Sequence, residues 1–429
     1  MASRWTTRCC SAHALIVVLS LASGAIAVAT QPPAAQPPAA QPSTPKAAKP
    51  SAPTIPKISE KALRALERTP LALFPVRTVW TLALNNRLVA PPAYGGGLAF
   101  FPIEGDRLVA YGVETGTQRW LVSSHTELKP AFGDGLVFVV EPGNLTARHA
   151  ADGTIAWQLP LSEEPAAEPV WDNGWLILAT SKGAILAYRS TDGHLVWRRD
   201  LESSAHASPA LAADRVYVPL GDGRVMALNV ENGTTVWERR LGGFPDDILA
   251  LDDRLFVGSR DTFFYSLKTT DGQINWRWRT GGDIIGRPFV DDHRVYFVSL
   301  DNVLRALDRN TGVQRWMRAV PLRPAWGPVN AGGATIVVAG ETTALQTFNT
   351  KDGTPAGDIP AGAEVAGGPV VFQDQGSHLP MLLFVTRDLA KGAVATLVGR
   401  SIEPKADPVS PLPSPTPVLP QLPGVKPPQ

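Results

Sequence analysis

The segment RVMALNVENGTTVWERR, residues 224–240, decides the fold. Two runs of β-prone residues, 224–229 and 235–239, flank the turn signal formed by Glu231, Asn232 and Gly233. A glycine after asparagine supplies the positive φ angle that a tight hairpin needs. Trp237 follows the glycine by four residues. The segment therefore predicts a β-hairpin whose second strand carries a tryptophan.

This Gly-x-x-x-Trp pattern recurs along the chain at intervals of 37 to 40 residues. Its copies pair Gly116 with Trp120, Gly153 with Trp157, Gly193 with Trp197, Gly233 with Trp237, Gly272 with Trp276, and Gly312 with Trp316. Six positions before each glycine stands a small residue, namely Ala110, Ala147, Ala187, Ala227, Ser266 and Ala306. A period of this length, with four short β-rich runs per unit, is typical of one blade of a β-propeller.

The starts of the units are marked as well, mostly by proline. These positions are Pro92, Pro130, Pro169, Pro209, Ile248, Pro288, Pro328 and Pro369. Only the last unit, which begins at Pro369, lacks an outer-strand segment at its end. Trp80, in the β-prone run 76–84, lies one repeat length before Trp120 and can supply that segment. We therefore predict an all-β, eight-bladed β-propeller of four-stranded blades over residues 76–402, closed by an N-terminal strand that carries Trp80 and completes the last blade.

The recurring residues have a structural explanation. The glycine adopts the turn conformation, the small residue lets strands approach closely, and the tryptophan can cover the seam to the adjoining blade. We interpret Trp80 and the six glycine and tryptophan pairs as a structural docking motif rather than as chemistry.

The two ends of the chain differ in composition from the repeats. Residues 1–29, with Arg4 and Arg8 before an apolar run, resemble a secretory signal peptide. Residues 30–58 predict a Pro/Ala/Gln-rich linker, 59–75 a short helix and lead-in, and 403–429 a proline-rich tail. Both cysteines, Cys9 and Cys10, precede the apolar run. We therefore expect export to the periplasm or cell envelope without a lipobox anchor.

The repeat resembles the tryptophan-docking motif of the PQQ-like propeller family, over essentially residues 76–402. That family includes quinoprotein dehydrogenases, sensor-like binding domains and the propeller subunit of the outer-membrane β-barrel assembly machinery. The compact repeats are most similar to the last of these. The resemblance implies a non-enzymatic scaffold that binds an envelope protein, with the assembly machinery as its most specific partner. We expect the chain to be a monomer. The alternatives are a PQQ-dependent quinoprotein dehydrogenase or a ligand-sensing propeller.

Residues with chemical potential are scattered. The histidines show no metal-ligand spacing, and the paired acids at 246–247, 252–253 and 291–292 fit turn positions. The sequence has no Gly-x-Ser-x-Gly nucleophile and no P-loop. We therefore predict no catalytic, metal or cofactor site, with PQQ not expected, and a formal charge of +1 argues against a nucleic-acid partner.

A partner surface is predicted from the order of strands in a blade. One face collects the first-to-second and third-to-fourth hairpins and should be acidic, with Asp192, Asp252, Asp253, Asp271, Asp291 and Asp292. The other face collects the blade crossings and should be more basic. It carries Arg240, Phe244, Arg323 and Trp326, which we predict to bind the partner because arginine and aromatic residues are enriched in hot spots. Alternatively, Phe244 and Trp326 plug the central mouth.

Overall fold

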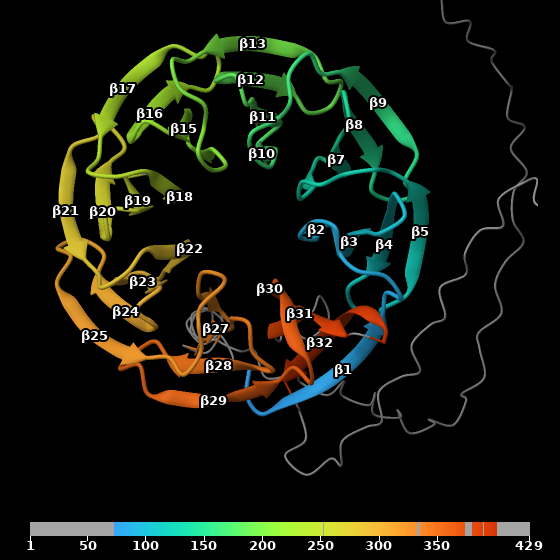
Figure 1. The fold of residues 1–429 in the computed structure, drawn as a ribbon, viewed down its shortest axis with the longest axis vertical. Helices are drawn as coiled ribbons and strands as arrows, with labels where there is room; N and C mark the ends of the chain where they lie inside the picture. Colours follow the sequence, from blue (N-terminus) through green and yellow to red (C-terminus); the bar gives the residue numbers. More distant parts are fainter. Residues whose placement is uncertain (1–72, 252, 333–334, 374–379, 389, 401–429) are drawn as a thin grey trace, which may run out of the picture. The chain divides into compact units, whose positions relative to one another are not determined.

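The computed structural model describes residues 73–400, except 252, 333–334, 374–379 and 389. These residues form eight four-stranded antiparallel sheets arranged in a ring, which confirms the predicted eight-bladed propeller (Figure 1). No helix that could cross a membrane is present in the described part of the chain. The signal peptide, the linker, the predicted helix at its residues 59–72 and the proline-rich tail lie outside the described residues.

The blades follow one another along the chain, and each begins with its innermost strand. Blades 1 to 4 are β2(Ala93–Gly95), β3(Leu98–Ile103), β4(Arg107–Gly112), β5(Gln118–Ser123); β6(Ala131–Gly133), β7(Leu136–Glu141), β8(Asn144–His149), β9(Ile155–Pro160); β10(Val170–Asp172), β11(Trp175–Ala179), β12(Ala184–Arg189), β13(Leu195–Asp200); and β14(Ala210–Ala212), β15(Arg215–Pro219), β16(Arg224–Asn229), β17(Thr235–Arg240).

Blades 5 to 8 complete the ring. They are β18(Pro245–Ala250), β19(Arg254–Ser259), β20(Phe263–Lys268), β21(Ile274–Arg279); β22(Ile284–Val290), β23(Arg294–Ser299), β24(Val303–Asp308), β25(Gln314–Ala319); β26(Val329–Asn330), β27(Thr335–Val338), β28(Ala344–Asn349), β29(Pro355–Pro360); and β30(Glu364–Gln373), β31(Pro380–Asp388), β32(Gly392–Arg400) with β1(Val76–Ala83). The pairing of β1 with β32 runs from Val76 opposite Arg400 to Ala83 opposite Val394, so the predicted closure by the N-terminal strand is confirmed.

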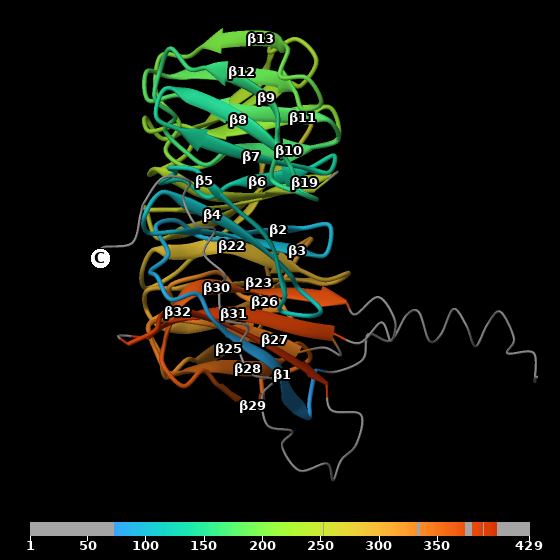
Figure 2. The same cartoon turned by 90° about the vertical axis from the view of Figure 1, so that its right-hand side faces the viewer.

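The strands run across the thickness of the ring, and their connections gather on its two faces (Figure 2). Because each blade is an antiparallel sheet in sequence order, one face holds the first-to-second and third-to-fourth hairpins. The opposite face holds the second-to-third turns and the crossings from blade to blade. The ring therefore presents two loop faces and an outer circumference made of the fourth strands.

Each motif tryptophan joins its own blade to the next one. The indole N–H donates to a carbonyl 30 to 34 residues further on, at 2.6 to 3.2 Å. The donors are Trp80, Trp120, Trp157, Trp197, Trp237, Trp276 and Trp316, and their acceptors are the carbonyls of Val113, Ala150, Ser190, Val230, Thr269, Arg309 and Thr350 in the same order. One large side chain thus supplies both apolar contact and a satisfied polar group at seven seams.

The motif glycines receive these rings. All six have φ angles between +64° and +78°, and a Cβ on any of them would lie within 3.1 Å of the indole of the preceding blade. They are Gly116, Gly153, Gly193, Gly233, Gly272 and Gly312, which lie against Trp80, Trp120, Trp157, Trp197, Trp237 and Trp276 respectively. Trp316 packs in the same way on Gly353, the glycine of the seventh unit. Glycine is therefore needed both for the turn and for contact with the ring.

The docked tryptophans differ slightly in exposure. Trp80, Trp120, Trp197, Trp237 and Trp316 are buried, with 8% or less of the side chain exposed. Trp157 and Trp276 are half-buried, and their N–H bonds are the two longest at 3.0 and 3.2 Å. The same contact is therefore made at all seven seams, and it is somewhat looser where blade 2 meets blade 3 and where blade 5 meets blade 6.

The eighth seam, between blades 7 and 8, has no motif tryptophan. Residues just before β1 occupy it instead. A Cβ at Gly357 would lie 3.1 Å from the Phe74 ring, and Leu73 is fully buried in the cluster that contains Ile359. The lead-in residues 73–74 therefore take the place of the missing tryptophan.

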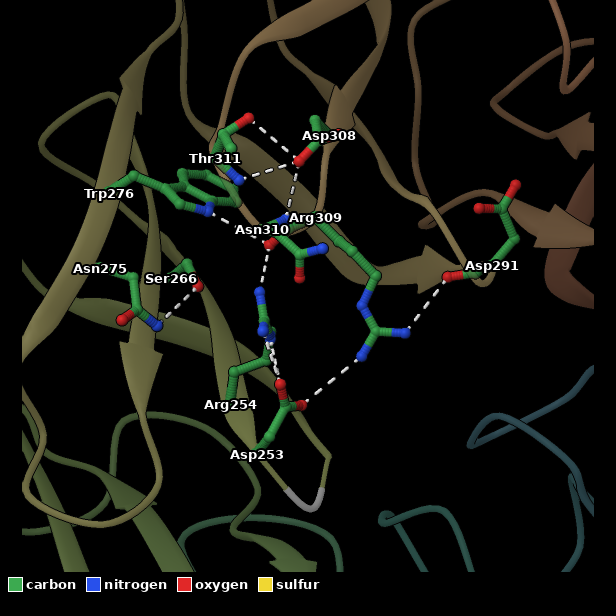
Figure 3. A network of polar contacts seen from close by, with 10 residues as sticks. All are labelled: Asp253, Arg254, Ser266, Asn275, Trp276, Asp291, Asp308, Arg309, Asn310 and Thr311. Carbon is green, nitrogen blue, oxygen red and sulfur yellow. Dashed lines mark hydrogen bonds and ion pairs between the residues drawn. The ribbon is translucent and has the colours of Figure 1, made fainter.

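Three seams carry an additional arginine. Arg215, Arg254 and Arg294 each begin the second strand of a blade and donate to a carbonyl of the neighbouring blade. The same carbonyl, on Thr269, Arg309 or Thr350 respectively, also accepts the hydrogen bond from the indole N–H of the docked tryptophan. Figure 3 shows the second case, where Arg254 also pairs with Asp253 at 2.5 Å. At each of the three seams between blades 4 and 7, one carbonyl oxygen therefore accepts two hydrogen bonds, one from an indole and one from an arginine.

Candidate functional site

The candidate site is a cavity of about 630 Å³ that is lined by the innermost strands and the residues next to them. Its wall combines apolar residues such as Leu249 and Phe289 with the charged residues Lys129, Glu168 and Arg287. The contributing segments come from every blade except the fourth, so the ring closes around it. Such concave, mostly apolar spaces with a few polar groups are the usual form of a ligand site.

The charges come from one repeat position, the residue just before the unit-start position. This position holds Lys129, Glu168, Asp247 and Arg287 in blades 2, 3, 5 and 6. In the remaining blades it holds uncharged residues, namely Ser208, Gly327, Gly368 and Pro91. Since equivalent positions of a propeller converge on its axis, one sector of the axial wall is charged and the opposite sector is formed by small residues.

Burial disfavours the charged form of two carboxyl groups near the axis. It raises the pKa of Glu168, which the nearby charge of Asp247 raises further and those of Lys129 and Arg287 oppose. Burial also raises the pKa of Asp247, and Asp246 adds to that effect. The sector therefore combines two carboxyl groups that resist ionisation with the positive charges of Lys129 and Arg287, and it can bind polar groups of either sign.

The docking-motif tryptophans lie away from this cavity. None of Trp80, Trp120, Trp157, Trp197, Trp237, Trp276 and Trp316 contributes to its wall within the described ring. All seven lie at the outer strands, where their contacts are with the neighbouring blade. These residues hold blades together, and the space at the axis is formed by a different set of side chains.

Trp326, predicted in the partner patch, is half-buried and contributes to the wall of this cavity. It packs over Gly368, where a Cβ would lie 2.8 Å from the indole Cδ1. This position agrees with the alternative in which Trp326 fills the centre of the ring. Tyr94 also lines the cavity, and its buried hydroxyl has no hydrogen-bond partner among the described residues.

The other three predicted partner residues lie on the blade crossings. Phe244 is 47% exposed and its ring lies 5.7 Å from that of His206, which belongs to the preceding crossing. Arg240 ends β17 and donates to the carbonyl of Asp222 at 2.8 Å. Arg323 is exposed between β25 and β26. Phe244 and Arg240 thus sit two crossings away from Arg323 and Trp326, and the four residues form two separate groups.

The crossing face, defined as the second-to-third turns and the blade crossings, contains more carboxylates than basic residues. It is nevertheless less acidic than the opposite, hairpin face, whose described connections hold 11 carboxylates and two basic residues, and this agrees with the predicted difference between the faces. The described connections of the crossing face contain the carboxylates Glu104, Asp106, Glu127, Glu163, Glu164, Glu168, Glu202, Asp222, Asp261, Asp283, Asp301 and Glu341. They contain fewer basic residues, namely Arg87, Lys129, Lys182, Arg260, Arg323 and Lys391. Asp222 and Asp261 accept backbone N–H groups two residues on, so part of the acidity comes from turn chemistry.

The paired acids do not form a metal centre in the described part of the chain. No group of three or more His, Cys, Asp or Glu residues is placed there to hold an ion. Asp291, Asp292 and Asp253 lie in hairpins, whereas Asp252 is outside the described residues. Asp246 and Asp247 lie within β18 and not in a loop as predicted, because the innermost strand of blade 5 begins before the unit-start position.

The sequence predictions missed the axial charges altogether. Lys129, Glu168, Asp247 and Arg287 carry no motif, and they are far apart in the chain. Their shared position before the unit-start residue was the available signal, since the repeat register brings that position to the axis.

Comparisons with known proteins identify the family. The family model described as outer membrane protein assembly factor BamB matches residues 76–168, 141–246 and 242–374. A protein of that name from Yersinia pestis is 32% identical over 95 residues, which are 21% of this chain and 24% of the relative. Another, from Shewanella oneidensis, is 30% identical over 70 residues, 16% of this chain and 18% of the relative. The chain thus aligns with about a quarter or less of the length of these relatives.

Solved structures share the ring. BamB from Moraxella catarrhalis is 19% identical, with a TM-score of 0.61, and the match covers 76% of this chain and 99% of that one. A quinohemoprotein alcohol dehydrogenase from Pseudomonas putida HK5 is 13% identical, with a TM-score of 0.61 and coverage of 80% and 78%. At these identities the likeness concerns the fold. Since the family model matches well over half of the chain, this propeller belongs to the family of the outer membrane protein assembly factor BamB.

Proposed function

We propose that this chain is a non-enzymatic protein-binding scaffold of the bacterial cell envelope that takes part in outer-membrane protein assembly. The observation that carries the proposal is the family match, which extends through most of the ring. A closed ring with wide loop faces and seams joined by tryptophans is a rigid platform, as a scaffold requires. The exported location predicted from residues 1–29 is part of this proposal.

The crossing face is the surface that fits a partner best. Phe244 is one of the few exposed large hydrophobic residues that lie outside the outer strands, and His206 supports its ring. Carboxylates lie on the neighbouring segments, namely Glu202 in the crossing that contains His206, Asp222 in the second-to-third turn of blade 4, and Asp246 at the start of β18. Phe244, with Arg240 four residues before it and carboxylates on the neighbouring segments, fits a partner that presents an apolar pocket bordered by an acidic group for Arg240 and by basic groups for the carboxylates.

A second candidate function is binding of a quinone cofactor in the axial cavity. It is favoured by the carboxyl groups Glu168 and Asp247 near the axis and by the structural likeness to a quinohemoprotein dehydrogenase. We place it second because the family match is to an assembly factor. An absorbance titration of the mature protein with PQQ and calcium separates the two, since a scaffold gives no saturable signal.

The scaffold is tested by affinity capture from an envelope extract of the protein's own host. The bait carries Phe244→Ala with Arg240→Gln, and Val89→Ala is the control because Val89 is 44% exposed on another crossing. We expect wild type and the control to capture outer-membrane assembly proteins and the double variant to lose them. Equal recovery with all three baits would contradict the proposed surface, and recovery of no envelope protein would contradict the scaffold itself.

A further inference from the structure

The outer strands of blades 3 to 6 form a surface that differs from both loop faces. In Figure 1, β13, β17, β21 and β25 follow one another around the circumference of the ring. Large hydrophobic side chains on or next to these strands are 39% to 56% exposed. They are Leu195, Val196, Val236, Ile274, Val313 and Met317. Most of the exposed large hydrophobic residues of the described chain therefore lie on this sector, which we call the arginine rim for the charges described next.

The same strands are rich in arginine. The three residues after the motif tryptophan are RRD in β13 (198–200), ERR in β17 (238–240), RWR in β21 (277–279) and MRA in β25 (317–319). Their two acidic residues are already paired, because Asp200 binds Arg198 at 2.6 Å and Glu238 binds Arg224 at 3.0 Å. The remaining arginines therefore give this sector a net positive charge.

Three of these arginines are exposed and have no carboxylate partner. Arg199 makes only a 3.4 Å contact with the Thr235 hydroxyl, and Arg277 lies 4.9 Å above the Phe263 ring. Arg279 makes no hydrogen bond or ion pair with another described residue. Guanidinium groups that lack a carboxylate partner and lie beside exposed apolar side chains suit a surface that binds carboxylates.

Protection of sheet edges does not explain this pattern. Charged residues on an edge strand do discourage unwanted pairing, and every blade has such an edge. However, β9 and β29 contain no arginine, and β1 and β5 contain one each, Arg77 and Arg119. A protective device would be needed equally on all eight blades, whereas the arginines are concentrated on four consecutive ones.

The shape of the rim distinguishes two anionic partners. The four strands lie on a convex arc, so a flat membrane could contact only part of it (Figure 1). A flexible segment can follow the arc, and the outer strands offer unpaired backbone edges as well as arginines. We propose that the arginine rim binds an extended acidic segment of a partner protein. The rim shares Arg240 with the crossing face, but Arg199, Arg277 and Arg279 do not belong to the patch proposed there, so this proposal does not depend on the function proposed for that face.

The test uses the mature full chain and a peptide of about 16 residues that alternates glutamate and valine, which mimics an acidic strand. The rim variant combines Arg199→Gln, Arg277→Gln and Arg279→Gln. The control combines Arg77→Gln, Arg87→Gln and Arg119→Gln, which removes the same charge from exposed arginines elsewhere on the ring. Urea midpoints confirm that both variants fold.

We expect the peptide to bind the wild type in low salt and to bind the rim variant about tenfold more weakly, as for three exposed ion pairs. The control should change less than twofold, and added salt should weaken binding. Equal losses in both variants, or none in the rim variant, would overturn the proposal. So would preferential binding of phosphatidylglycerol vesicles with the same arginine dependence, which would identify a membrane surface. Capture through the crossing face should be unchanged in the rim variant.

Discussion

Gly272→Ala tests the docking of Trp237 between blades 4 and 5. Gly272 has a φ of +68°, and a Cβ there would lie 2.5 Å from Cε3 of the Trp237 ring. The ring cannot simply move, because it is only 8% exposed and its N–H donates to the carbonyl of Thr269 at 2.7 Å. The left-handed conformation costs alanine about 1–2 kcal/mol, and overpacking adds about 1–3 kcal/mol. We expect a total loss of roughly 2–5 kcal/mol in the free energy of unfolding.

Gly135→Ala is the matched control. Gly135 has a φ of +73° in a hairpin on the same face, and a Cβ there would meet nothing within 4 Å. Gly135→Ala should lower the free energy of unfolding only by the conformational cost of about 1–2 kcal/mol. In a Trp237→Leu background, the smaller side chain should accept the new methyl group, so Gly272→Ala should also cost about 1–2 kcal/mol.

Urea unfolding of wild type, the single variants and the double variant gives these energies. The coupling between Gly272→Ala and Trp237→Leu should be about 1–3 kcal/mol. A cost of Gly272→Ala equal to that of Gly135→Ala, together with no coupling, would refute the docking argument.

Three further predictions concern single side chains. Burial opposes the charge of Asp301, but hydrogen bonds from Arg305, Ser299 and the Gly281 N–H lower its pKa to about 2. The ionised carboxylate should therefore add about 2 kcal/mol to the free energy of unfolding at neutral pH, and this should be lost between about pH 4 and pH 2. Asp301→Asn should remove this part of the acid unfolding curve. Arg254→Met should lower the free energy of unfolding by about 1–2 kcal/mol, measured in urea, because it deletes the second donor at one seam. Burial raises the pKa of Asp247, so the ionised carboxylate destabilises the fold above the usual titration range of aspartate. Asp247→Asn should therefore raise the melting temperature at pH 7 and not at pH 3. A lower melting temperature at pH 7 would show that the carboxylate is stabilising.

The repeats made the ring predictable, because every blade repeats the same turn and docking residues. Residues such as Gly233 and Trp237 fix both the strand boundaries and the blade seam. The eighth seam was not predictable in the same way. Phe74 and Leu73 belong to no motif, and they meet Gly357 only after the ring has closed.

The site was harder to predict than the fold. Trp326 was assigned to an exposed patch because it is out of register, yet the short inner strands leave space at the axis that it helps to line. The difference in charge between the two faces was predictable, but the carboxylates of the crossing face were not, because residues such as Asp222 and Asp261 lie in turns outside the two crossings that carried the prediction. Arg215, Arg254 and Arg294 recur at the repeat spacing, which was an available signal, but the sequence alone does not show that their acceptors lie in the next blade.

The central claim, that this propeller is a scaffold for outer-membrane protein assembly, is tested most directly in its own host. The gene is deleted, and the β-barrel proteins of the outer membrane are quantified by mass spectrometry against other envelope proteins. We expect a selective fall in β-barrel proteins that is restored by the wild type and by Val89→Ala, and not by the Phe244→Ala, Arg240→Gln double variant. Unchanged β-barrel levels after deletion would contradict the claim.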